Sequence, residues 1–336
     1  MVWLKYLACL VIILFAGTRL ARYGDAIGEK TGVGGLWIGL VLIAAITSVP
    51  ELVTGVSSVA LVGLPDLAMG TLLGSCLFNL SILALLDILY RPAPVLSQVR
   101  LRHVASAGGG IVLVGIVALA IGVGGVFSEF TLGWVGIPSI IILILYLVGM
   151  RQMFRFERSH PVEQPEAALP QYAEIPLRTV YLRFTLAAIA VIGAGIWVAF
   201  VGDEIAQTTG WGASFVGSLF LAISTSVPEL VVTIAALRLG ALDMAVADIL
   251  GSNMFNIVII FAVDLFYSQG SVLSAVSSVH LITAIVAMVM SLLVIVGLRF
   301  RQRRKTFIIM SWYTPALIGL YIFGVYILFT SGIGPG

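Results

Sequence analysis

The chain has 336 residues, of which 60% are hydrophobic and only 10% are charged. An ordinary soluble domain carries about 25% charged residues, so a water-soluble fold is excluded. The net charge of +2 gives no reason to expect nucleic acid as a partner. Cys9 and Cys76 lie in apolar runs and the three histidines are scattered, which argues against a disulfide scaffold and against a zinc site.

Ten apolar segments follow one another along the chain. A helix that crosses a bilayer needs about 20 apolar residues, and each segment is long enough to supply one. The first segment lacks a clear cleavage site, so a membrane span is favoured there over the alternative, a secretory signal. The segments cover approximately residues 2–20, 34–62, 66–90, 103–124, 127–150, 179–201, 211–239, 242–267, 275–299 and 307–331.

One extended polar stretch, residues 151–178, contains several prolines and many charges, so we predict a linker there. The chain is thereby divided into residues 1–150, the linker and residues 179–336. An N-terminus on the outside places 17 of the 18 Lys and Arg residues on the inner side and leaves only Lys5 outside. Because positively charged loops face the cytoplasm, this orientation is predicted and the linker is expected to be cytoplasmic.

The two halves of the chain resemble each other. Residues 47–54 read TSVPELVT and residues 225–232 read TSVPELVV, and residues 66–87 align with residues 243–264. Five spans in each half would invert the second half relative to the first. Inverted repeats are typical of secondary transporters, with the substrate site at mid-membrane between them. The sequence therefore predicts an all-α membrane protein with ten transmembrane helices in two inverted five-helix repeats.

Glu51 and Glu229 occupy matching positions in the middle of apolar segments. An ionisable side chain at that depth is costly and normally faces a cavity or a partner, which indicates a shared site. Pro50 and Pro228 precede the glutamates and should kink both helices. The kinks should free backbone carbonyls, those of Ile46 and Ser224 by this argument.

Other oxygen-bearing side chains accompany the glutamates at helical spacing. Hydroxyl, amide and carboxylate oxygens from four helices are expected to converge, and such a set suits Ca²⁺, which takes six to eight oxygens. Gly74 and Gly251 are predicted to be packing positions that bring the helices close together. The polar residues are Thr47, Ser48, Ser75 and Asn79 in the first half and Thr225, Ser226, Ser252 and Asn256 in the second.

The duplicated T-S-V-P-E, each copy followed by G-S-x-x-x-N, resembles the α-repeats of the cation/calcium exchanger superfamily, in its Na⁺/Ca²⁺ exchanger family of prokaryotic type. The resemblance covers both halves and implies antiport of Ca²⁺ against Na⁺ by alternating access. It also implies a ligand set. That set comprises the side chains of Thr47, Ser48, Glu51, Ser75, Asn79, Thr225, Ser226, Glu229, Ser252 and Asn256, with the backbone carbonyls of Ala44 and Ala222 in place of those of Ile46 and Ser224.

The sequence departs from that family in ways that affect the counter-ion. Well-known Na⁺/Ca²⁺ members carry Asp at the position of Asn256, whereas both halves here carry Asn. Asp248 stands where the first half has Thr71, one turn before Ser252. It is interpreted either as an extra cation or proton site or as a polar residue at the rim of the cavity.

The leading hypothesis is therefore a Na⁺/Ca²⁺ antiporter, with a Ca²⁺/H⁺ exchanger as the alternative and an ion channel as a weaker one. No enzymatic activity and no cofactor are expected, because the chain has no nucleotide-binding motif. The expected partners are Ca²⁺, Na⁺ and membrane lipid, with no obligate protein partner. The expected location is a prokaryotic plasma membrane. The matched acids Asp66 and Asp243, and likewise Asp87 and Asp264, are interpreted as structural residues near helix ends.

Overall fold

The computed structural model describes residues 2–32, 35–123, 130–159, 171–209 and 215–331. Helices dominate it, and a two-residue hairpin of β1 (Thr131–Leu132) and β2 (Val135–Gly136) is the sheet within these ranges. The first-half helices are α1 (Val2–Thr31), α2 (Gly35–Trp37), the π-helix η1 (Ile38–Ile43), α3 (Ala44–Thr47), α4 (Val49–Ala60), α5 (Pro65–Leu89), α6 (Val95–Gln98), α7 (His103–Gly122) and α9 (Ile137–Ser159). The second-half helices are α10 (Leu177–Thr209), α11 (Phe215–Thr225), α12 (Val227–Arg238), α13 (Leu242–Phe266), α14 (Val272–Ala275), α15 (Val279–Arg299) and α16 (Tyr313–Ser331).

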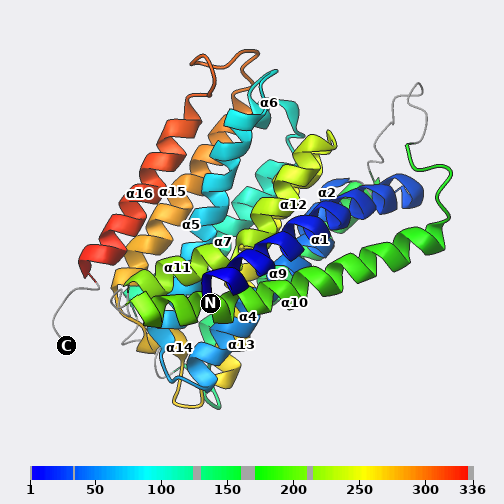
Figure 1. The fold of residues 1–336 in the computed structure, drawn as a ribbon. Coiled ribbons are helices and arrows are strands. Elements are labelled where there is room, and N and C mark those ends of the chain that lie inside the picture. Colours follow the sequence, from blue (N-terminus) through cyan, green and yellow to red (C-terminus); the bar gives the residue numbers. More distant parts are fainter. Residues whose placement is uncertain (1, 33–34, 124–129, 160–170, 210–214, 332–336) are drawn as a thin grey trace.

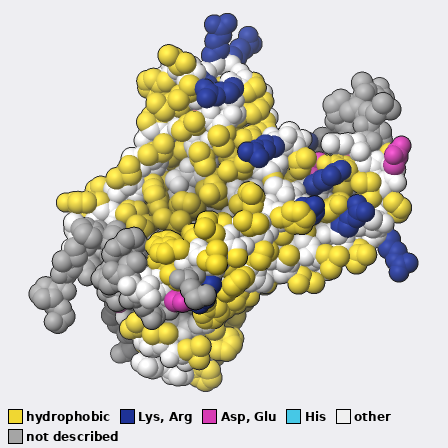
Figure 2. Space-filling view, viewed as in Figure 1, with side chains coloured by type: hydrophobic (Ala, Val, Ile, Leu, Met, Phe, Trp, Pro, Cys, Tyr) yellow, Lys and Arg dark blue, Asp and Glu magenta, His cyan; other side chains and the backbone are white. Residues whose placement is uncertain are grey.

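Each of the ten predicted apolar segments contains at least one helix, and residues 34–62 contain four consecutive helical elements, α2, η1, α3 and α4. Among the residues described, seven helices are long and apolar enough to cross a membrane, and eight when the bent pair of residues 38–47 and 49–60 counts as one span. Figure 2 shows the apolar surface of the bundle, with most of the visible Lys and Arg side chains over the top and the right of the view. The chain is thus a multi-pass helical membrane protein.

Part of the predicted linker is helical. Residues 151–159 continue helix α9, and helix α10 already begins at Leu177. Residues 160–170 lie outside the described part of the chain. Helix α9 therefore continues beyond the end of its apolar segment and into the predicted linker.

Helices α5 and α13 form the centre of the bundle, and two-thirds of each apolar window is buried. Each begins after a tight turn at a glycine with positive φ, +73° at Gly63 and +78° at Gly240, a conformation that glycine adopts without steric cost. Helices α1 and α10 pack along each other and cross the broken helices on one side of the bundle (Figure 1). The centre of the molecule is therefore built from equivalent segments of the two halves.

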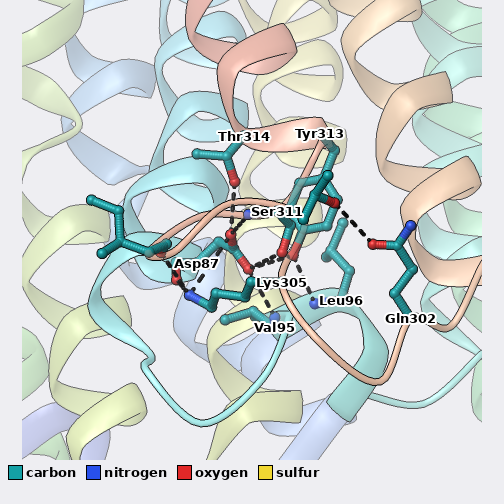
Figure 3. Close-up of polar contacts among 10 residues, drawn as sticks. Asp87, Val95, Leu96, Gln302, Lys305, Ser311, Tyr313 and Thr314 are labelled. Atoms are coloured by element: carbon teal, nitrogen blue, oxygen red, sulfur yellow. Dashed lines mark hydrogen bonds and ion pairs between the residues drawn. The ribbon is translucent and has the colours of Figure 1, made fainter.

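Asp87 and Asp264 join the ends of these central helices to the other half of the chain. Asp87 accepts hydrogen bonds from the Ser311 N–H (2.7 Å), the Tyr313 hydroxyl (2.7 Å) and the Thr314 hydroxyl (2.8 Å) at the start of α16 (Figure 3). Asp264 accepts hydrogen bonds from the Gly136 N–H (2.7 Å) and from the Ser139 hydroxyl at the start of α9. Both carboxylates are fully buried, so each fastens a late helix of one half onto the central helix of the other.

Asp66 and Asp243 make a second pair of contacts between the halves. Asp243 lies 2.8 Å from Nε2 of His103, and Asp66 lies 3.2 Å from Nε2 of His280. Asp243 also accepts the Arg100 N–H at 2.9 Å. The acids at the beginnings of α5 and α13 thus contact the beginnings of the fourth helix in the opposite half, in agreement with the structural interpretation.

Candidate functional site

The predicted kinks occur in both halves at equivalent serines. Ser48 has φ −88° and ψ 7°, and Ser226 has φ −88° and ψ 8°, so neither continues the helix before it. Pro50 and Pro228 sit in the first turn of the next helices, α4 and α12, where the missing proline N–H costs nothing. The first-half pair bends by 44° at the break. A proline two residues after each serine therefore fixes where each span is interrupted.

Each broken helix holds the glutamate of the other half. The Ser48 hydroxyl donates to Oε1 of Glu229 at 3.1 Å, and the Ser226 hydroxyl donates to Oε1 of Glu51 at 2.9 Å. All four side chains have no exposed surface. The two helix breaks thus lie against each other. The pairing is crossed, because each serine donates to the glutamate of the opposite half and not to the glutamate that follows it in its own half.

The carbonyls of Ala44 and Ala222 lie beside these breaks. Each accepts the N–H of the following broken-helix serine, at 3.1 Å in both halves. Ala222 also accepts the Thr225 hydroxyl at 3.1 Å and the Ser75 hydroxyl at 3.4 Å. These two carbonyls therefore belong to the same polar cluster as the serines and glutamates.

Helices α5 and α13 add the next oxygens to this cluster. The Thr47 hydroxyl lies 3.5 Å from the Ser252 hydroxyl, and it also donates to the Ile43 carbonyl at the end of η1 (3.2 Å). Asn79 and Asn256 lie one turn after Ser75 and Ser252 and are fully buried. The predicted oxygens from the four helices thus gather in the protein interior, where residues of one half contact residues of the other half.

Several of these buried oxygens have no hydrogen-bond partner among the residues described. They are Oε2 of Glu51, Oε2 of Glu229, and the side-chain oxygens of Asn79 and Asn256. A buried polar atom left unpaired costs about 1–3 kcal/mol, and more when it is charged. Oxygens of this kind are the ligands of hard cations. A cation bound among them would offset that cost.

Close backbone packing brings the central helices to the breaks. A Cβ atom on Gly251 would lie 2.2 Å from the Leu40 carbonyl oxygen, and one on Gly39 would lie 2.4 Å from the Met244 carbonyl oxygen. Gly74 is less tightly packed, with Cβ of Ala222 at 3.2 Å. The packing role predicted for Gly74 and Gly251 is confirmed. The contact partner of Gly251 is the π-helix η1, a type of irregularity that frequently marks functional sites.

Asp248 is buried beside the cluster, with 1% of its surface exposed. The Thr233 hydroxyl lies 3.2 Å from Asp248 Oδ2 and also donates to the Glu229 carbonyl one turn earlier in its own helix. Asp248 Oδ1 has no partner among the described residues. Asp248 is therefore an interior residue connected through Thr233 to the helix that carries Glu229, and both interpretations of it remain predictions.

The sequence interpretation missed Thr233. Its signal was available, because Thr233 stands four residues after Glu229, on the same helical face. A metal cluster of three or more His, Cys, Asp and Glu side chains is absent from the part of the chain that the structure describes. The cluster therefore consists mainly of neutral hydroxyl, amide and carbonyl oxygens around paired glutamates.

The fold matches solved structures of a transporter. A structure of the sodium–calcium exchanger NCX_Mj superposes with a TM-score of 0.72 and 21% identity, over 97% of this chain and 99% of that one. At that identity the similarity shows the fold alone. The chain therefore shares the fold of that multi-pass membrane protein.

The family follows from the sequence comparison. A family model described as sodium/calcium exchanger protein matches residues 1–151 and 179–332, so this chain belongs to the sodium/calcium exchanger family. It is 28% identical to the inner membrane protein YrbG of Escherichia coli over 78% of this chain and 79% of that protein. It is 25% identical to the putative antiporter CaxA of Alkalimonas amylolytica, over 78% of this chain and 79% of that one. The sodium/calcium exchanger MaX1 of Methanosarcina acetivorans is 30% identical over 40% of this chain and 38% of that protein.

Proposed function

We propose that this chain is a secondary active antiporter that exchanges Ca²⁺ for Na⁺ by alternating access. The observation that supports it best is the crossed pairing of Ser48 with Glu229 and Ser226 with Glu51. Each glutamate keeps a second oxygen without a partner among the described residues. Two carboxylates balance the charge of one divalent cation and can alternatively be balanced by monovalent ions. Ca²⁺ and its counter-ion would thus compete for the same two side chains.

In this proposal the ligands are the residues that the family resemblance implied. The hydroxyls, amides and carbonyls supply neutral oxygens, which lower the cost of dehydrating the ion without adding charge. Asp248 adds a third carboxyl outside the pair. The implied set comprises Ala44, Thr47, Ser48, Glu51, Ser75, Asn79, Ala222, Thr225, Ser226, Glu229, Ser252 and Asn256, and Asp248 is added to it as the extra cation or proton site.

Helices α1 and α10 are suited to control access to the cluster. A Cβ atom on Gly195 of α10 would lie 2.5 Å from Cγ of Pro50 and 3.4 Å from Cγ of Pro228, so α10 contacts both kinks. Gly17 of α1, the equivalent residue, contacts Val231 of α12 in the same way, with 2.9 Å between such a Cβ and Val231 Cγ1. In this proposal, sliding of the α1–α10 pair opens the cluster to one side of the membrane and then to the other.

The proposed topology is ten spans in two inverted repeats, with the N-terminus outside and the segment between α9 and α10 in the cytoplasm of a prokaryotic cell. The distribution of basic residues supports this orientation. Cysteine labelling at Lys5 and at Arg303 in intact cells tests it. The proposal requires that an impermeant reagent modify the first cysteine and leave the second unmodified.

A second candidate, Ca²⁺/H⁺ exchange, is favoured by a specific observation. Asn79 and Asn256 both carry neutral amides, and Asp248 lies nearby as an interior carboxyl. Fewer fixed charges favour fewer Na⁺ ions or a proton as the counter-ion.

Uptake of ⁴⁵Ca²⁺ into proteoliposomes distinguishes these possibilities. Vesicles loaded with Na⁺, with K⁺, or with an acidic K⁺ buffer would be compared at matched ionic strength. Na⁺/Ca²⁺ exchange requires uptake from the Na⁺-loaded vesicles alone. Uptake driven by the acidic interior would identify a proton-coupled exchanger, and uptake without any counter-ion gradient would indicate a channel.

A further inference from the structure

A basic pocket of about 340 Å³ lies at the end of the bundle, and none of the residues of the glutamate cluster lines it. It forms where α5 ends and where the connection between α15 and α16 folds back over that end. Figure 3 shows the polar network beside it, in which Lys305 lies next to Asp87. The pocket is lined by Arg91, Pro92, Arg304, Lys305, Thr306, Phe307 and Ile308.

The lining carries three cations and no acid. Arg91 and Arg304 are exposed and have no acidic partner among the described residues. Arg301, in the same connection, is in contrast bound to the carbonyls of Ser97 (2.9 Å) and Val99 (2.8 Å). Two guanidinium groups in the pocket thus remain available, and guanidinium is the side chain that binds phosphate oxygens in bidentate geometry.

Lys305 completes the positive lining. Its ammonium donates to the Asp87 carbonyl and to the Ile309 carbonyl (3.0 Å), and it lies 3.9 Å from Asp87 Oδ2. Burial lowers the pKa of Lys305, the Asp87 carboxylate opposes that shift, and the neighbouring Arg91 cation adds to it. The Asp87 carboxylate is itself occupied by the hydrogen bonds from α16. An anion in the pocket would relieve the repulsion between these cations.

Apolar side chains continue directly from the cations. Phe307 is 49% exposed and Ile308 is completely exposed. Helix α15 ends at Arg299 and α16 begins at Tyr313, so the connection between them lies where two apolar helices leave the hydrocarbon. Charged groups and large apolar groups side by side at that level match the boundary between lipid headgroups and acyl chains.

We propose that this pocket binds the phosphate headgroup of an anionic phospholipid. Arg91 and Arg304 contact the phosphate oxygens, Lys305 contributes charge from the pocket floor, and Phe307 and Ile308 lie against the acyl chains. Inorganic phosphate would satisfy the cations but leave these two apolar side chains in water. The site is separate from the glutamate cluster and does not depend on which ions the chain transports.

Native mass spectrometry of the full-length protein in detergent tests this proposal. Short-chain phosphatidylglycerol and phosphatidylcholine with the same acyl chains would be titrated at about 0.15 M salt, where charges more than about 8 Å apart are screened. We expect phosphatidylglycerol to bind at least ten-fold more tightly. Equal affinity for the two lipids would overturn the proposal without any substitution in the chain.

Charge variants locate the site. The double variant Arg91→Gln/Arg304→Gln should weaken phosphatidylglycerol binding about 25-fold, since each basic residue near a lipid surface contributes about five-fold. Arg303→Gln is the matched control, because Arg303 is exposed in the same connection but does not line the pocket. It should change the affinity less than two-fold. Equal losses in the two variants would mean a diffuse basic surface and no pocket site.

An apolar variant separates lipid from free anion. Ile308→Ser should weaken phosphatidylglycerol binding about three-fold or more and leave unchanged the dissociation constant of inorganic phosphate, obtained from its competition with the lipid. If inorganic phosphate displaces the lipid at equal concentration and Ile308→Ser has no effect, the pocket is an anion site and the lipid assignment is wrong. Arg91, Arg304 and Ile308 are all exposed, and a thermal unfolding curve confirms that each variant remains folded.

Discussion

Four residues after Glu229 the second half carries Thr233, whereas four residues after Glu51 the first half carries Gly55. Gly55 packs against Val263, with 3.1 Å between a Cβ built on Gly55 and Val263 Cγ2. Thr71, the equivalent of Asp248, donates to the Leu67 carbonyl of its own helix at 2.9 Å. The first half therefore has an apolar contact at the position of Thr233 and a neutral hydroxyl at the position of the Asp248 carboxyl.

This difference shows which parts of the cluster need both halves. The glutamates, the serines at the breaks and the asparagines are present twice, as expected if one ion is held between the repeats. The Asp248–Thr233 pair is present once. Because the Asp248–Thr233 pair is found in one half only, binding of an ion between the two repeats does not require it. We expect the pair to determine another property, such as the choice of counter-ion.

The largest effect is expected at the paired glutamates. Glu51→Gln and Glu229→Gln should each reduce ⁴⁵Ca²⁺ uptake below about 1% of wild type, because losing about 3 kcal/mol of cation binding weakens affinity more than 100-fold. The measurement is ⁴⁵Ca²⁺ uptake into proteoliposomes under a saturating counter-ion gradient. Glu204→Gln, which removes an exposed carboxylate paired with Lys5, serves as the control. Normal transport by either glutamine variant would contradict the equivalence of the two halves.

The buried acids at the ends of α5 and α13 should differ in their contribution to stability. Asp87 binds the beginning of α16 through three side-chain hydroxyls, of Ser311, Tyr313 and Thr314, whereas Asp264 binds one, that of Ser139. Asp87→Asn should therefore destabilise the protein by about 3 kcal/mol and Asp264→Asn by about 2 kcal/mol, since hydrogen bonds to a charged acceptor contribute about 1.5–3 kcal/mol. Thermal unfolding in detergent measures both. The opposite ranking would show that the hydroxyls of α16 contribute little.

Removing the Asp248 carboxyl, which has no counterpart in the first half, tests its role in coupling Ca²⁺ uptake to the counter-ion. Asp248→Asn should raise the counter-ion concentration that supports half-maximal Ca²⁺ uptake about ten-fold. This change corresponds to about 1.4 kcal/mol of counter-ion binding. Ca²⁺ binding itself should change less than three-fold, because Asp248 contacts the glutamate helix through Thr233. Titrations of Na⁺ and of pH, each at fixed Ca²⁺, give the two dependences. An equal change in Ca²⁺ affinity would make Asp248 part of the Ca²⁺ site itself.

The smallest effect is expected at the histidines that join the halves. His103 is fully buried against Asp243, whereas the partner of His280, Asp66, has a side chain that is 56% exposed. His103→Gln should lower stability by about 1–2 kcal/mol and His280→Gln by less than about 1 kcal/mol, since exposed ion pairs contribute little. Thermal unfolding of the two variants side by side measures the difference. Equal shifts would show that exposure of the acid does not matter at these helix ends.

The sequence contained most of the elements from which this site is built. The repeat at residues 47–54 and 225–232 located both breaks, and the proline in each copy explains them. Close packing at Gly251 was also predictable, because a small residue before Ser252 admits a neighbouring backbone. These features were accessible because each depends on the identity of one residue in its own helix.

The crossed pairing was not accessible in the same way. The spacing of Ser48 and Glu51 suggests a shared helical face, but Ser48 is the residue at which the helix stops, so its hydroxyl turns to Glu229 instead. The π-helix at residues 38–43 and the extension of α9 to Ser159 were likewise unforeseen. They depend on the approach of α13 and on packing between helices, and local sequence does not determine either.

The bond network at Asp87 also has a consequence for biosynthesis. The 227 residues between Asp87 and Thr314 take roughly 10–45 s to translate at about 5–20 residues per second. During that time α5 must wait in the bilayer with an acid whose partners in α16 do not yet exist. The network at Asp87 is therefore completed only when α16 arrives, and a chain that stops before Ser311 lacks the four hydrogen bonds that Ser311, Tyr313 and Thr314 donate to this carboxylate.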